Sequence, residues 1–140
     1  MSIWNRQVSP ADINAMNKNT AAEHMGVVIT EIGEDTVTGE MPVDSRTHQP
    51  YGLLHGGASV LLAESLGSLG AALAAEKGTK VVGLEINANH LGGVTDGTVV
   101  GVASPSHVGR TTHVWDIRIH HKETGKAICV SRITMAVLSA

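Results

Sequence analysis

A single carboxylate inside an apolar, helix-forming stretch is the most chemically suggestive feature of the sequence. Glu64 lies within Ala58–Ala75, a run made mostly of Ala, Leu, Ser and Gly. Burying a carboxylate in such a helix is costly unless the group is paired or used. On a helical wheel its face also carries Gly57, Val60, Ser68 and Ala71. An exposed face would normally carry several charges, so the pattern favours a functional role for Glu64.

Ser68 lies one turn after Glu64 on the same helix face. Its hydroxyl can hydrogen-bond a substrate, a water molecule or Glu64 itself. It can equally bond back to a helix carbonyl, and the sequence leaves these alternatives open.

The loop before this helix supplies polar groups of a second kind. His55, Gly56 and Gly57 immediately precede the apolar run. The N–H groups at a helix N-terminus are unpaired and lie at the positive end of the helix dipole, which suits a developing oxyanion. The glycines alone can also serve only to turn the chain. Together with the amide of Gln49 and the carboxylate of Glu64, they predict an acyl-transfer site.

Other catalytic patterns are missing from the sequence. It has no G-x-S-x-G elbow, phosphate-binding loop or dinucleotide-binding fingerprint. His120 and His121 are adjacent and would point to opposite faces of a strand, and there is no H-E-x-x-H pair, so we expect no metal site. Cys129 lies in an apolar run and is expected to be a core residue rather than a nucleophile.

The bulk properties indicate one ordinary globular domain. A chain of 140 residues suits a single domain, and a net charge of -3 with only 2% aromatic residues argues against nucleic-acid binding. The single cysteine and the absence of an apolar N-terminal run favour a cytoplasmic location. The segment from Gly56 to Ala75 is long enough to span a membrane. Because it contains Glu64 and three serines, we expect a buried helix and no membrane partner.

The long helix is expected from Gly57 to about Glu76, with Gly78 after its end. Two stripes follow its axis, one of leucines and one of small residues: Leu62, Leu66, Leu69 and Leu73, and Ala63, Gly67, Gly70 and Ala74. Each mid-helix glycine costs about 1 kcal/mol relative to alanine. We therefore expect the small stripe to pack closely against a sheet or a second helix.

The rest of the chain predicts a short helix and several strands. The helix runs from Ser9-Pro10 to about Met16, because Ser9 and Pro10 suit the cap and first helical positions. The strands are Val27–Ile32, Thr36–Met41, Val81–His90, Thr98–Ala103, His113–His120 and Ala127–Leu138, with turns at Ser104-Pro105 and Thr124-Gly125. No helix separates the later strands, so they should pair antiparallel. The expected fold is α+β, a curved antiparallel sheet of five to six strands that buries all faces of one central helix.

The stretch from Gln49 to Ser68 resembles the core motif of hotdog-fold acyl-CoA thioesterases of the PaaI type. Val81–His90 and His107–Arg110 extend the resemblance over nearly the whole chain. It is strongest to the subgroup that contains 1,4-dihydroxy-2-naphthoyl-CoA hydrolase of menaquinone synthesis and the proofreading thioesterase of enterobactin synthesis. The resemblance implies a single hotdog thioesterase domain over residues 1–140.

The resemblance also implies a role for each residue of the motif. Glu64 would be the nucleophile or the general base, and Ser68 would position it. The Gly56 N–H would bind the thioester oxygen, Gln49 would orient or polarise the thioester, and His55 would support the thioester or the attacking water. The matching positions along the CoA arm are Gly83, His90, Leu91, Gly92, Gly93, His107, Val108, Gly109, Arg110, Thr111 and Thr112.

The implied substrate is an acyl-CoA with an aromatic acyl group, 1,4-dihydroxy-2-naphthoyl among the candidates, and no metal or redox cofactor is implied. The alternatives are a proofreading thioesterase that acts on an acyl carrier protein, a non-catalytic acyl-CoA-binding module, and a hotdog hydratase, for which the sequence offers no convincing match. In the resembling enzymes two subunits share each site, Glu64 coming from one and Gln49 to Gly56 from the other. A homodimer, often assembled as a dimer of dimers, is therefore expected.

The chain departs from the family pattern at one point. Relatives often carry Arg two residues after the histidine that matches His90, where this chain has Gly92. A guanidinium for a CoA phosphate is therefore missing there. Arg110 or Lys80 can compensate, and the choice between CoA and carrier-protein substrates stays open.

Overall fold

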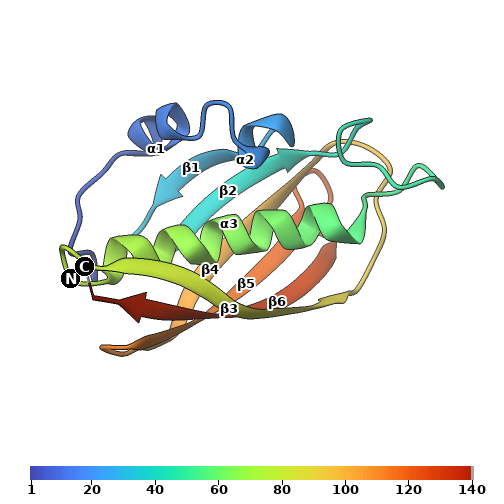
Figure 1. The fold of residues 1–140 in the computed structure, drawn as a ribbon. Coiled ribbons are helices and arrows are strands. Elements are labelled where there is room, and N and C mark those ends of the chain that lie inside the picture. The colour runs from blue at the N-terminus through green and yellow to red at the C-terminus, as the bar shows by residue number, and fades with distance from the viewer. Residues whose placement is uncertain (140) are drawn as a thin grey trace.

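The computed structural model describes residues 1–139 as one sheet wrapped around one long helix (Figure 1). The six strands pair in the order β1-β2-β4-β5-β6-β3, and every pair is antiparallel. The elements are α1 (Pro10–Met16), α2 (Ala21–His24), β1 (Val28–Ile32), β2 (Val37–Pro42), α3 (Gly56–Ala74), β3 (Lys80–His90), β4 (Thr98–Val108), β5 (Thr112–His121) and β6 (Ala127–Leu138). The predicted α+β arrangement, with its long central helix and its short N-terminal helix, is confirmed.

The small residues of α3 allow the helix to lie very close to the sheet. An added Cβ at Gly70 would lie 2.7 to 2.9 Å from three ring carbons of Trp115, which is fully buried. An added Cβ at Gly67 would lie 2.6 Å from the Cγ2 of Ile133. The close packing expected to offset the cost of mid-helix glycines is therefore present, because at each glycine the helix backbone contacts the sheet directly.

The N-terminal segment of the chain is hydrogen-bonded to the C-terminal end of α3. The backbone N–H groups of Asn5 and Arg6 both donate to the carbonyl of Leu73, and the Asn5 side chain donates to that of Ala74. These donors satisfy carbonyls that a helix C-terminus leaves without partners. The helix therefore ends at Ala74, two residues before the predicted end.

The two edge strands of the sheet, β1 and β3, differ in how much of their edge is covered. At β1 the side chain of Asn14 in α1 donates to the Ile29 carbonyl and accepts from the Ile29 N–H, both at 2.9 Å, so part of that edge is hydrogen-bonded. At the opposite edge β3 runs for 11 residues, with Val82 45% and Leu84 64% exposed. A long apolar edge strand is a template for pairing with another chain.

Two expectations about local structure are wrong, and one element was missed. The predicted turn at Ser104-Pro105 is absent, because β4 continues to Val108. The pairing of β4 with β5 shifts register between Pro105 and His107, and such a bulge tolerates a residue that lacks an N–H. The short helix α2 was not predicted. The sheet also leaves one face of α3 uncovered, and Gly57 and Glu64 on that face are exposed.

The helix α3 is long and apolar enough to span a membrane by length and composition. However, 56% of the apolar window is buried inside the domain, as expected of a core helix.

Replacing Gly70 with alanine tests the close seating of α3. Helix propensity alone would stabilise the variant by about 1 kcal/mol. The contact with the fully buried Trp115 ring should outweigh this gain, because overpacking costs about 1–3 kcal/mol. Chemical denaturation should therefore show a lower free energy of unfolding for Gly70→Ala, and a more stable variant would contradict the packing argument.

Candidate active site

The N-terminus of α3 presents one free backbone donor. His55 is the N-cap residue, and its Nδ1 accepts a hydrogen bond of 2.8 Å from the Gly57 N–H. The His55 carbonyl accepts hydrogen bonds from the backbone N–H groups of Ala58 and Ser59. Within residues 1–139 the Gly56 N–H has no hydrogen-bond partner. It therefore lies free at the positive end of the helix dipole.

Gln49 supplies a second donor near the first. Its side-chain Oε1 accepts from the Tyr51 N–H, and its backbone bonds to Leu53 and Gly52 close the loop. Because the oxygen of the amide is used in this way, its NH₂ group is left to donate. Gln49 and Gly56 line the same pocket, which has a volume of about 380 Å³.

The end of β3 forms the other wall of this pocket. His90 packs directly on Gly56, because an added Cβ at Gly56 would lie 2.8 Å from the His90 Nε2. Leu91, Gly92 and Gly93 continue the wall. The arrangement groups two backbone or amide donors with one imidazole in a concave site of the size expected for a small ligand.

Sequence reasoning missed a cation at this site. Lys126 in the β5–β6 turn donates from its Nζ to the Gly93 carbonyl at 2.9 Å. A Cβ at Gly92 would lie 2.6 Å from the Lys126 Cε, so the lysine lies against the glycine that replaces the family arginine. No sequence signal joined the two, since they are distant in the chain.

The loop that carries Gln49 is braced by an ion pair. The guanidinium of Arg46 donates to both carboxylate oxygens of Asp44, at 3.1 and 2.7 Å. The hydrogen bonds from Arg46 lower the pKa of Asp44 to about 2. Thr47, which is buried, donates from its hydroxyl to the Pro42 carbonyl.

Glu64 lies on a different part of the helix. It is eight residues after Gly56 in the sequence, which corresponds to about 12 Å along a helix axis. Its Oε2 lies over Gly83 in β3, 2.9 Å from where a Cβ would be. Ser68 has its Oγ 3.8 Å from the Met135 sulfur, and no hydrogen bond joins it to Glu64 among the described residues.

The structure therefore divides the predicted site residues into three groups and leaves His55 apart from them. One pocket brings together Gln49, Gly56, His90, Leu91, Gly92 and Gly93. Farther along α3 lies a second group: Glu64, Ser68 and Gly83. The end of β4 and its hairpin to β5 carry the third: His107, Val108, Gly109, Arg110, Thr111 and Thr112. His55 borders a separate cavity with Met25 and His48, on another side of the helix N-terminus.

Two further groups with shifted pKa values are buried in the core. Burial lowers the pKa of His113, whose Nδ1 accepts from the Trp115 indole N–H. Cys129 is 1% exposed, which confirms the prediction of a core residue, and this burial raises the pKa of its thiol. Among residues 1–139 no three His, Cys, Asp or Glu side chains cluster as metal ligands would.

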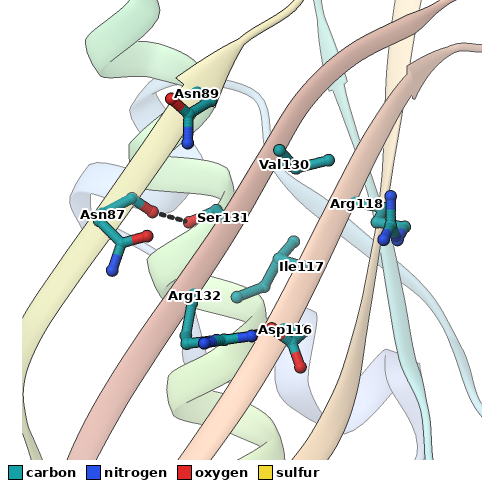
Figure 2. A pocket seen from close by; sticks show the side chains of 8 residues that line it. All are labelled: Asn87, Asn89, Asp116, Ile117, Arg118, Val130, Ser131 and Arg132. Carbon is teal, nitrogen blue, oxygen red and sulfur yellow. Dashed lines mark hydrogen bonds and ion pairs between the residues drawn. The ribbon is translucent and has the colours of Figure 1, made fainter.

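A hollow of about 380 Å³ lies on the sheet face away from α3 (Figure 2). There Arg132 donates to Asp116 at 3.0 Å, and Ser131 donates to the Asn87 carbonyl at 2.8 Å. The Ser106 hydroxyl and then the Arg132 guanidinium hold the pKa of Asp116 below its ordinary value. The hollow contains none of the predicted site residues.

Comparison with known proteins identifies the family of the chain. The thioesterase superfamily profile matches residues 51–128. The proofreading thioesterase EntH of Cronobacter sakazakii is 47% identical, over 97% of this chain and 98% of its own. A thioesterase structure from Haemophilus influenzae has a TM-score of 0.95 at 46% identity, covering 98% of this chain and 95% of that one.

A thioesterase structure from Pseudomonas aeruginosa has a TM-score of 0.96 at 48% identity, covering 99% of this chain and all of that one. These matches confirm the predicted hotdog fold and the predicted family. The chain therefore belongs to the thioesterase superfamily and is a hotdog-fold enzyme that hydrolyses thioesters.

Proposed function

We propose that the enzyme hydrolyses an aromatic acyl-CoA, 1,4-dihydroxy-2-naphthoyl-CoA among the candidates, to the free acid and CoA. Glu64 acts as nucleophile or general base, and the Gly56 N–H binds the oxyanion. The observation that carries the proposal is the free Gly56 N–H beside the Gln49 amide, paired with a carboxylate that the same chain holds about 12 Å away. A reacting pair must approach to about 3–3.5 Å, so one chain supplies only half of a working site.

Pairing of two β3 strands completes the site. If the two-fold axis passes through Asn87, antiparallel pairing across the β-bulge after Gly83 sets Gly83 opposite the partner's His90. Glu64 lies over Gly83, and Gly56 lies against His90, so the same pairing brings Glu64 to the partner's Gly56. The exposed edge of β3 and its apolar Leu84 support this dimer.

In this dimer one chain supplies the donors that bind the oxyanion, and the other supplies the carboxylate. The Gly56 N–H and the Gln49 amide stabilise the negative charge that develops on the thioester oxygen. As general base, Glu64 takes a proton from water while the water oxygen attacks the carbonyl carbon. The C–S bond then breaks, and Glu64 returns the proton to the leaving thiolate. As nucleophile, the carboxylate instead attacks the carbonyl carbon, the C–S bond breaks and the thiolate leaves, and water then hydrolyses the resulting anhydride to the free acid and Glu64.

Engineered relatives support the choice of Gln49 and Glu64. The Pseudomonas aeruginosa thioesterase structure carries a glutamine-to-alanine replacement. Two structures of a Staphylococcus aureus protein, 38% and 39% identical to this chain, carry a glutamine-to-alanine and a glutamate-to-alanine replacement. Those two positions have the same separation along the chain as Gln49 and Glu64.

A substrate held by a carrier protein is the second candidate. The similarity to the proofreading thioesterase EntH favours it. Both substrates present a phosphopantetheine arm, and Lys126 beside Gly92 offers a cation near the pocket rim for its phosphate. Comparing acyl-CoA with the same acyl group on a carrier protein separates the two candidates.

The predicted dimer of dimers would use the outer face of the sheet. Helix α3 covers only the concave face, and half-buried valines alternate along the uncovered strands: Val100, Val102, Val114 and Val130. A sheet face that is partly apolar is stabilised by a second layer, which another dimer would provide.

Removing the Glu64 carboxylate should abolish most of the activity. Glu64→Ala and Glu64→Gln should lower kcat by about 10²- to 10⁴-fold, because both remove the base or nucleophile. Glu76→Ala, at another exposed glutamate just beyond the helix, is the matched control and should keep its rate. Thiol release from a panel of acyl-CoAs measures both, and near-normal turnover by Glu64→Ala would exclude the mechanism.

Mixing two inactive variants should restore activity if the site is shared. A Glu64→Ala chain and a chain carrying Gln49→Ala and His55→Ala form hybrids with one intact site of two. Random assortment should therefore recover roughly a quarter of the wild-type rate. Mass spectrometry of the intact dimers checks that hybrids form, and hybrids without activity would argue against a shared site.

Gly83→Ala should impair catalysis more than stability. The added Cβ would crowd only the Oε2 of Glu64, the end of a flexible side chain, because Ile133 and Met135 lie at an ordinary contact distance of 3.9 Å, so the free energy of unfolding should change little. Displacing the carboxylate by about 1 Å can cost about 10²-fold in rate. In a Glu64→Ala background the same substitution should cost no further activity. An equal loss in both backgrounds would show that Gly83 does not act through Glu64.

A further inference from the structure

The segment 93–97, which joins β3 to β4, is held by hydrogen bonds from other parts of the chain. Each of its successive carbonyls accepts one bond of 2.9 or 3.0 Å. Because a carbonyl can only accept, the histidine rings among the partners donate from Nε2. The donors to Gly93, Val94, Thr95, Asp96 and Gly97 are, in that order, the Lys126 Nζ, the Leu54 N–H, the His48 Nε2, the His121 Nε2 and the Val43 N–H. The path of the segment is therefore set by its neighbours.

This segment lies beside the hairpin that carries Gln49. Within that hairpin, residues 47–55, the Gln49 N–H donates to the Leu53 carbonyl at 2.8 Å. Gln49 and Gly93 line the same pocket. The hairpin and the segment both lie at the end of the domain where α3 begins (Figure 1). The bonds between them therefore set the spacing of the pocket walls.

Two hydrogen bonds among residues 1–139 join the hairpin to the segment. One is a backbone bond, from the Leu54 N–H to the Val94 carbonyl, which no side-chain substitution removes. The other is the bond of 2.9 Å from the His48 ring to the Thr95 carbonyl. His48 is adjacent to Gln49, and across a planar peptide two successive Cα atoms stay about 3.8 Å apart. A displacement of the His48 backbone therefore moves Gln49 as well.

His48 acts from outside the substrate pocket. It is not among the residues that line the pocket of Gln49 and Gly56, and its ring borders the separate cavity beside His55. Any effect of His48 on the reaction therefore has to pass through the hairpin. The Gln49 side chain is the group that transmits it, because its Oε1 accepts from the Tyr51 N–H of the same hairpin and its NH₂ group moves with that hairpin.

We propose that His48 is a positioning residue for thioester hydrolysis. Its bond to the Thr95 carbonyl holds the hairpin at the distance from segment 93–97 that directs the Gln49 amide to the thioester oxygen beside the Gly56 N–H. The inference rests on the proposed function, because it takes Gln49 as a polarising donor. It gives a catalytic consequence to a side chain that makes no contact with the pocket.

The test is a double-mutant cycle between His48 and Gln49. His48→Leu removes the donor and keeps a side chain of moderate size, whereas His48→Gln restores an N–H donor at a similar reach. Each is made in the wild-type chain and in a Gln49→Ala chain, which keeps Glu64 and therefore a residual rate. Thiol release from the acyl-CoA that the wild-type enzyme hydrolyses fastest gives kcat and KM.

His121→Leu is the matched control. It removes the donor to the neighbouring carbonyl, that of Asp96, from β5, which does not carry Gln49. Its effect on kcat should therefore be the same with and without Gln49. Denaturant unfolding of every variant gives the folded fraction, by which each rate is divided. His48→Met takes the place of His48→Leu where the leucine variant does not fold.

His48→Leu should lower kcat about tenfold in the otherwise wild-type enzyme, a part of the roughly 10²- to 10³-fold that removal of an oxyanion donor costs. KM should change less than kcat, because the displaced amide acts on the transition state more than on the bound ester. His48→Gln should recover most of the rate. In the Gln49→Ala chain, His48→Leu should cost no more than about twofold, since the group that it positions is absent.

An equal loss of kcat from His48→Leu with and without Gln49, or no recovery in His48→Gln, would overturn the inference. A loss from His121→Leu that also disappears in the Gln49→Ala chain would overturn it too, because every loosening of the segment would then have the same effect. If Gln49→Ala keeps the wild-type kcat, the role of Gln49 in the proposed function fails, and this inference falls with it. If Gln49→Ala is impaired and the cycle with His48 is additive, only this inference fails.

Discussion

The close contact between α3 and the sheet is the constraint on which the rest of the structure depends. Gly70 lies against the ring of Trp115, and no side chain separates them. A helix of 19 residues seated this closely has no freedom to shift along the sheet. The positions of Gly56 at its N-terminus and of Glu64 two turns later are therefore fixed relative to β3.

This rigidity is the physical reason for proposing that two chains share the chemistry. The Gly56 N–H and the Glu64 carboxylate belong to one straight helix, so no local adjustment can bring them to one carbonyl. The uncovered β3 edge offers the solution, because a two-fold operation exchanges the two ends of the strand. At Gly83 the Glu64 carboxylate occupies the space that a side chain would fill, and this contact is consistent with the proposed pairing of two β3 strands. The fold thus places the open β3 edge beside both the carboxylate and the donors that the proposed dimer would bring together.

Much of the fold followed from local pattern, and the errors have local causes too. Alternating strands and the two stripes of α3 were predictable because period and turn residues are properties of short segments. Pro105 misled the prediction, since a bulge lets a proline remain within a strand. The exposure of Glu64 was missed because a wheel shows which residues share a face, but not whether a sheet of finite width covers that face.

The sequence by itself determined the residue types of the site, their order and the helix that carries them. It also determined the family, since motif and spacing persist in relatives that are nearly half identical. Only the tertiary structure decided which of those residues meet. It grouped Gln49 and Gly56 with His90, left Glu64 apart from them, and placed Lys126 beside Gly92. The reason is physical: spacing along a chain specifies neighbours within one helix or strand, whereas contacts between elements depend on how closely those elements pack.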